Sequence, residues 1–200
     1  MQKRQRRRPG TRLLLTLAAL ASVIVGYYLG QYWQRQPLAD LSAVFYPSGQ
    51  KVDYPPALGL AEDAGARSGT WRLFLVADTR AAECRQLMRH FATVFNRMAP
   101  SPQIQAHLRL TLLAYDRPEP AAVTAFTGGV TWVEVVSAER EQLDTLSAQL
   151  GILPNPGGWC SATAANSILV APDQTRWALI PYEQAAIMAR NILTLIDFVE

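Results

Sequence analysis

Cys84 and Cys160 are the only cysteines among the 200 residues of the chain, and their thiols offer the most versatile chemistry in it. Two thiols can form a structural disulfide, cycle as a redox pair, or bind a soft ion such as Cu(I) through two sulfurs. They can also be inert, since the spacing of Cys84 with Leu87 and Phe91 is typical of a buried helix face. The residues alone leave these four alternatives open.

The other residues with chemical potential do not form a motif. His90 and His107 have no second metal ligand near them in sequence, so each is interpreted as a surface or packed histidine. Asp78 and Asp116 follow two predicted strands, at the edge of an α/β sheet where ligands bind. Helix capping by Asp78 or Thr79, and a turn at Asp116, account for both without catalysis.

The N-terminus has the pattern of a membrane anchor. Residues 13–29 are uncharged and mostly apolar, and 17 residues is about the shortest stretch that spans a bilayer. Six basic residues precede this stretch, so the positive-inside rule predicts a cytoplasmic N-terminus and an exported C-terminal domain. A cleaved signal peptide is the alternative, but the small residues around Ala19 lie inside the apolar stretch, not beyond it.

Composition argues against nucleic-acid binding. The formal net charge of +3 comes from the basic tail, because beyond Arg35 only 12 basic residues face 16 acidic ones. A basic aromatic surface, the usual footprint of nucleic-acid binding, is not predicted in the domain. In an exported compartment, two cysteines suggest a disulfide before other uses.

Hydrophobic patterning predicts alternating strands and helices after the anchor. A turn is expected over residues 47–50. We expect strands over residues 43–46, 71–77, 107–114, 132–136, 167–171 and 175–180, and helices over 80–98, 120–127, 137–150 and 182–199. This order predicts an α/β fold: a thioredoxin-like mixed sheet flanked by helices and preceded by one transmembrane helix.

Three segments of this domain resemble one known family. They are FLVADTRAAEC (74–84), LLAYDRPEP (112–120) and NSILVAPDQTRWALIPY (166–182). Residues 43–199 resemble through them the Sco/SenC family, membrane-anchored proteins of thioredoxin fold associated with copper delivery to cytochrome oxidase. In that family two cysteines in a CxxxC turn and a later histidine bind copper.

The resemblance places the metal-binding positions of the family on Arg80, Cys84 and Asn166. Only Cys84 matches a ligand, and neither a guanidinium nor an amide replaces a thiolate or an imidazole. The usual copper site is therefore expected to be degenerate, and no cofactor is expected unless copper binds two sulfurs. The resemblance also brings the loop of Cys160 toward Cys84, which makes a Cys84–Cys160 disulfide a candidate.

The sequence thus predicts a basic cytoplasmic tail (1–12), a transmembrane helix (13–29), a linker (30–42) and a Sco-like domain (43–200). We expect a bacterial inner-membrane protein whose domain faces the periplasm. Its expected partners are the lipid bilayer and an oxidase subunit or assembly factor in the membrane, an analogy at the level of fold. The alternatives are a thiol–disulfide oxidoreductase, the one enzymatic reading, or a two-sulfur copper carrier using Cys84 and Cys160.

Overall fold

The computed structural model divides the chain into two compact units, Met1–Leu41 and Ser42–Glu200. It describes residues 9–39, 41–60, 69–152, 160–161 and 165–200, with the backbone alone for 9–14 and 31–39. Most of the predicted basic tail, residues 1–8, lies outside the described residues.

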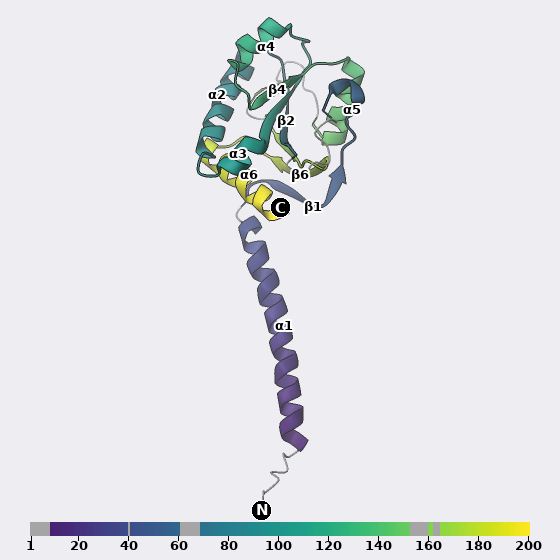
Figure 1. Ribbon diagram of the computed structural model, residues 1–200, viewed down its shortest axis with the longest axis vertical. Coiled ribbons are helices and arrows are strands. Elements are labelled where there is room, and N and C mark those ends of the chain that lie inside the picture. Colours follow the sequence, from purple (N-terminus) through teal and green to yellow (C-terminus); the bar gives the residue numbers. More distant parts are fainter. Residues whose placement is uncertain (1–8, 40, 61–68, 153–159, 162–164) are drawn as a thin grey trace, which may run out of the picture. The chain divides into compact units, whose positions relative to one another are not determined.

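The first unit contains one long helix, α1 (Pro9–Ala39), drawn in purple and blue in Figure 1. Within the described part of the chain, no helix is both long and apolar enough to cross a membrane. The anchor over residues 13–29 therefore stays a prediction. The linker predicted over residues 30–42 stays a prediction, and its residues 30–39 are helical, because α1 continues through Ala39. The cause is that Gln, Tyr, Trp and Arg, which follow Gly30, are all compatible with a helix.

The second unit is built on a mixed sheet of six strands. Their spatial order is β1-β6-β5-β2-β3-β4. The strands β2, β3 and β4 pair in parallel, whereas β5, β6 and β1 are added through antiparallel pairs. The bounds are β1 (Val44–Lys51), β2 (Trp71–Ala77), β3 (Leu108–Ala114), β4 (Val133–Val136), β5 (Ser167–Val170) and β6 (Thr175–Ile180).

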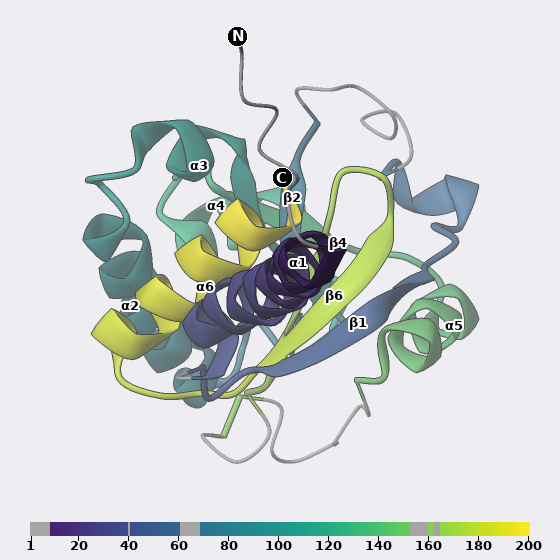
Figure 2. The same ribbon diagram turned by 90° about the horizontal axis from the view of Figure 1, so that it is seen from below.

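Helices cover both faces of this sheet. Figure 2 shows α2 and α6 on one side of the sheet and α5 on the other. The bounds are η1 (Pro56–Leu58), α2 (Ala82–Arg97), α3 (Pro102–His107), α4 (Pro120–Thr127), α5 (Arg140–Leu150) and α6 (Ala185–Val199). This arrangement confirms the predicted thioredoxin-like mixed sheet flanked by helices.

The central strand β2 is buried along its whole length, as its sequence, apolar except at Arg72, predicts. Phe74 and Val76 pack into a cluster that includes Leu146 of α5. Successive side chains of a strand point to opposite faces, so Leu73 and Leu75 face α2 and α6 instead. The sheet is thus packed on both sides, and the carboxyl end of β2 leads through a short turn into α2.

The turn predicted over residues 47–50 is wrong. These residues continue β1 to Lys51, and the pairing with β6 shifts register between Phe45 and Gln50. Gly49 has a φ of 60°, which suits a bulge more than a hairpin turn. Pro47 and Gly49 are tolerated because β1 is an edge strand, where a missing ladder donor faces solvent.

The helices α2, α5 and α6 each begin two or three residues later than predicted. The residue before α2 is Ala81, which makes no side-chain cap, so capping by Asp78 or Thr79 is wrong. Asp78 instead forms a turn, since its Oδ1 accepts the Arg80 backbone N–H at 2.9 Å. The short helix α3 was not predicted, and it moves the start of β3 from His107 to Leu108.

Candidate functional site

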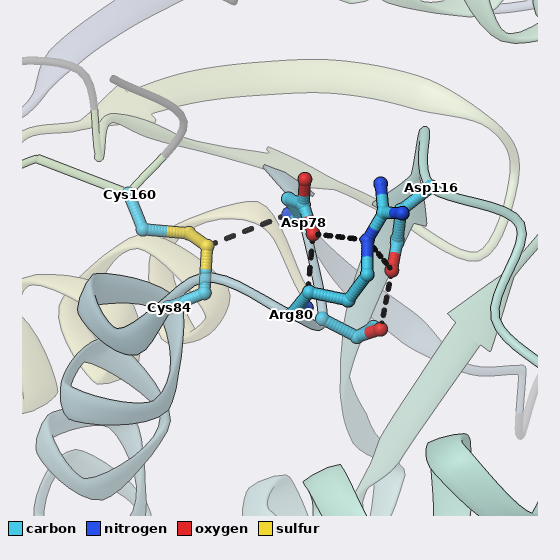
Figure 3. A network of polar contacts seen from close by, with 6 residues as sticks. Asp78, Arg80, Cys84, Asp116 and Cys160 are labelled. Carbon is cyan, nitrogen blue, oxygen red and sulfur yellow. Dashed lines mark hydrogen bonds and ion pairs between the residues drawn. A yellow bond between two sulfur atoms is a disulfide. The ribbon is translucent and has the colours of Figure 1, made fainter. Parts of the chain in front are cut away.

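The two cysteines meet in a disulfide at the carboxyl end of β2. Cys84 is the third residue of α2, and Cys160 lies in the segment that leads toward β5. Their sulfurs are 2.00 Å apart and their Cα atoms 4.9 Å apart (Figure 3). Both residues are buried, with 1% of Cys84 and 7% of Cys160 exposed. The structure therefore contains the Cys84–Cys160 bridge that the sequence offers as a candidate.

The surroundings of the two sulfurs differ. The backbone N–H of Asp78 points at Cys84 Sγ from 3.4 Å, and Cys84 lies in the first turn of α2, where helix N–H groups carry partial positive charge. Cys160 Sγ lies 3.9 Å from the carbonyl oxygen of Val76. Were the bridge reduced, these contacts would stabilise a thiolate on Cys84 and a protonated thiol on Cys160.

A polar cluster lies next to the disulfide, in the turn of residues 78–80 and at the end of β3 (Figure 3). The Asp116 side chain is only 1% exposed, yet it carries a carboxylate. Its Oδ2 accepts the Thr79 hydroxyl at 2.5 Å and lies 3.6 Å from Arg80 Nε. Arg80 Nε also lies 3.4 Å from Asp78 Oδ1. The guanidinium is thus held between two carboxylates.

The buried carboxylate of Asp116 has fewer hydrogen-bond partners than its two oxygens can accept. Among the described residues, its Oδ1 has no hydrogen-bond partner. A buried carboxylate is costly without compensating charge or hydrogen bonds. Its stability therefore depends on Thr79 and on the positive charge of Arg80. The sequence analysis placed Asp116 at this sheet edge and attributed it to a turn. Turn formation alone does not explain why its side chain is buried.

An open cleft of about 240 Å³ lies beside Cys160 of the disulfide. It is lined by Cys160 together with residues from α2 and from the stretch just before α6. These lining residues are Glu83, Gln86, Leu87, Cys160, Ser161 and Tyr182. Cys160 thus has a route to solvent that is shaped by named side chains.

Asn166 does not join this site by any described contact. It is half-buried directly before β5, and no hydrogen bond connects it with Arg80 or Cys84 among the described residues. In the same part of the chain, no three His, Cys, Asp or Glu residues gather closely enough to hold a metal. Of the three positions that the resemblance assigns to copper, Cys84 thus carries a bridged sulfur and Arg80 an ion-paired guanidinium, while Asn166 offers an amide.

His90 is packed rather than free. Its Nε2 lies 3.3 Å from Met188 Sδ, and its ring centroid is 4.5 Å from that of Tyr182. Burial lowers the pKa of His90 below its ordinary value of 6.5, and a smaller effect of the Glu183 backbone opposes this. The ring is therefore neutral at pH 7. His107, the other histidine, ends the short helix α3.

No protein-family model matches this sequence, and no curated protein matches it. Solved structures do resemble it. Apo Sco1 from Thermus thermophilus is 13% identical over 78% of this chain and 96% of its own, with a TM-score of 0.53. BsSco, described as a member of the Sco family of cytochrome c oxidase assembly proteins, is 11% identical over 79% of this chain and 92% of its own, also at 0.53. Copper-bound yeast Sco1 is 10% identical over 64% of this chain and 77% of its own, at 0.52.

These likenesses establish a Sco-like thioredoxin fold and confirm the resemblance at that level. At such low identity they say nothing of activity. Arg80, one of the two residues that differ from the family pattern, lies in the polar cluster next to the disulfide, so the function has to be argued from this site.

Proposed function

We propose that the protein is a membrane-anchored, Sco-like assembly factor that helps to build a haem-copper oxidase through protein contacts. The observation that carries this proposal is the bridged and ion-paired state of Cys84 and Arg80, at two of the three positions where the family binds copper. A domain that keeps the fold but lacks the copper-binding residues is best suited to act through surface contacts with partner proteins. The oxidase enters by analogy with the Sco proteins, of which BsSco is described as an assembly protein.

Copper does not fit the residues at the family positions. A soft Cu(I) ion needs thiolate, thioether or imidazole donors. Arg80 brings positive charge, Asn166 brings an amide, and Cys84 is consumed by the bridge. A two-sulfur site on Cys84 and Cys160 requires prior reduction of the disulfide, so it remains an alternative that depends on redox chemistry.

The location is part of the proposal. The apolar stretch 13–29 and the six basic residues before it support an anchor with a cytoplasmic N-terminus. The domain would then face the periplasm of a bacterium, beside membrane-embedded partners. Tethering raises the effective concentration of the domain near such partners, which suits a protein that acts by contact.

Deletion of the gene is expected to remove most of the haem-copper oxidase activity of the membranes. The full-length chain should restore the activity, and so should the Cys84→Ala/Cys160→Ala variant at equal protein level. Phe91→Ala is the matched control, because it loses about 3–5 kcal/mol of stability from a large core cavity while keeping the bridge. A chain exported by a cleavable signal, without residues 13–29, should restore less.

Unchanged oxidase activity in the deletion strain, measured by oxygen uptake with an artificial electron donor, would refute the assembly role. Rescue by Phe91→Ala but not by the double cysteine variant would show that the bridge acts chemically.

A second function, thiol–disulfide exchange, is favoured by the cleft beside Cys160 and by the N–H that points at Cys84 Sγ. If the bridge is functional, its reduction potential should lie above about −300 mV, whereas a structural bridge lies below it. Equilibration of the full-length protein with glutathione or dithiothreitol buffers measures this value. Anaerobic titration of the reduced protein with Cu(I) tests the two-sulfur copper site in the same samples.

A further inference from the structure

The cleft beside Cys160 is the entrance through which a thiol would reach the disulfide. Cys160 belongs to the cleft lining, and Cys84 does not. Cys84 is also the more deeply buried of the two, at 1% exposed. An incoming thiol in this cleft therefore meets the sulfur of Cys160 first.

The contacts of the two sulfurs favour the same direction of attack. Attack on Cys160 makes Cys84 the leaving group, and a thiolate that is stabilised leaves faster. The N–H of Asp78 and the first turn of α2 stabilise this thiolate. Attack on Cys84 would instead expel a thiolate from Cys160 beside the Val76 carbonyl oxygen, which repels negative charge.

The lining of the cleft is negatively charged. Glu83 is the one charged residue among the described residues that line it. Arg80, in the nearby turn, is already paired with Asp78 and Asp116. The domain beyond Arg35 is acidic as a whole. A negatively charged cleft lining attracts positively charged segments and repels thiol compounds with a net negative charge, such as glutathione.

We propose that Cys160 is the sulfur attacked, and that Glu83 selects partner cysteines flanked by Lys or Arg. The inference rests on the exchange function above and adds the attacked atom and the substrate class. A basic neighbour also lowers the pKa of the partner thiol, so that the attacking thiolate is present at neutral pH.

The exchange conserves atoms and electrons. The electron pair of the partner thiolate forms a bond to Cys160 Sγ, the Cys84–Cys160 bond breaks, and Cys84 leaves as the thiolate. A second thiol of the partner, deprotonated, then attacks the partner sulfur of this mixed disulfide and releases Cys160, which takes up a proton. The partner dithiol is oxidised by two electrons to a disulfide, and Cys84 and Cys160 are reduced.

Two short peptides test the proposal on the oxidised full-length protein in detergent. They carry a single cysteine and differ only in having Lys or Glu on both sides of it. A single cysteine stops the reaction at the mixed disulfide, and a quench with N-ethylmaleimide alkylates the released thiol. Mass spectrometry should find the peptide on Cys160 and the maleimide on Cys84. The reverse pattern overturns the assignment of the attacked sulfur.

Rates give the charge preference. After division by the rate of each peptide with neutral 2-hydroxyethyl disulfide, the Lys peptide should react about tenfold faster than the Glu peptide. Glu83→Gln should bring this ratio of rates close to one. Glu141→Gln is the matched control, because Glu141 is likewise an exposed acid in the first turn of a helix, on α5, and should leave the ratio unchanged.

The failures are distinguishable. No adduct with either peptide overturns the exchange function itself, and this inference with it. Adducts that form at equal corrected rates, or a ratio that survives Glu83→Gln, overturn the proposed substrate class alone.

Discussion

Replacing both Cys84 and Cys160 with alanine is expected to lower the free energy of unfolding by about 4 kcal/mol. The bridge spans 76 residues of sequence, and its main effect is to restrict the unfolded chain. Alanine is the right replacement because both residues are buried, where a serine hydroxyl would need a new partner. Small domains are stable by only about 5–15 kcal/mol, so the loss is a large fraction of the total.

Urea unfolding of the full-length protein in detergent measures this loss. The slope of the free energy with urea should rise in the variant, since its unfolded state exposes more surface without the cross-link. Wild-type protein in excess reductant is the control and should unfold at nearly the same urea concentration as the variant. A loss below about 1 kcal/mol would contradict the prediction and would mean that the bridge hardly restrains the unfolded chain.

The outline of the fold was predictable because it depends on local patterns. The buried strand 71–77 is apolar except at Arg72, and the apolar residues of α2 recur at helical spacing. Element ends were less predictable, because periodicity does not mark them. The edge strand β1 was cut short in the prediction, since Pro47 and Gly49 signal a turn wherever they occur and only tertiary pairing with β6 shows a bulge.

The position of the site could be predicted from the sequence, but the bonding of its residues could not. The sequence favoured a bridge but left a redox pair, a metal site and inert thiols open, because it does not give the distance in space between two cysteines 76 positions apart. Arg80 was recognised at the position of a lost ligand. Its ion pair with Asp116 was not predicted, because the two residues follow different strands, β2 and β3. That contact depends on the parallel pairing of β2 with β3, which brings Ala77 opposite Ala114.

The pairing gives Arg80 a role of its own. A buried carboxylate that lacks its counter-charge is strongly destabilising, and the full effect for a buried pair is about 3–5 kcal/mol. Arg80 is 75% exposed, so solvent screens part of the interaction with Asp116. Arg80→Met, which keeps the aliphatic stem and removes the charge, should therefore cost about 2 kcal/mol of unfolding free energy at neutral pH.

A double-mutant cycle isolates this charge pair. Asp116→Asn removes the negative charge and keeps an oxygen that can accept from the Thr79 hydroxyl. In that background Arg80→Met should cost much less, which corresponds to a coupling energy of at least about 1 kcal/mol. The measurement is urea unfolding of the wild type, the two single variants and the double variant.

The exposed pair Arg117–Glu139 is the matched control, because its side chains are 54% and 73% exposed. Its coupling, measured with Arg117→Met and Glu139→Gln, should stay below about 0.5 kcal/mol and vanish in concentrated salt. The coupling of Arg80 with Asp116 should persist in salt, because the carboxylate is shielded from solvent. Equal coupling in the two cycles would mean that Arg80 is only a surface charge, and that the loss of a ligand at this position was not accompanied by a new structural role.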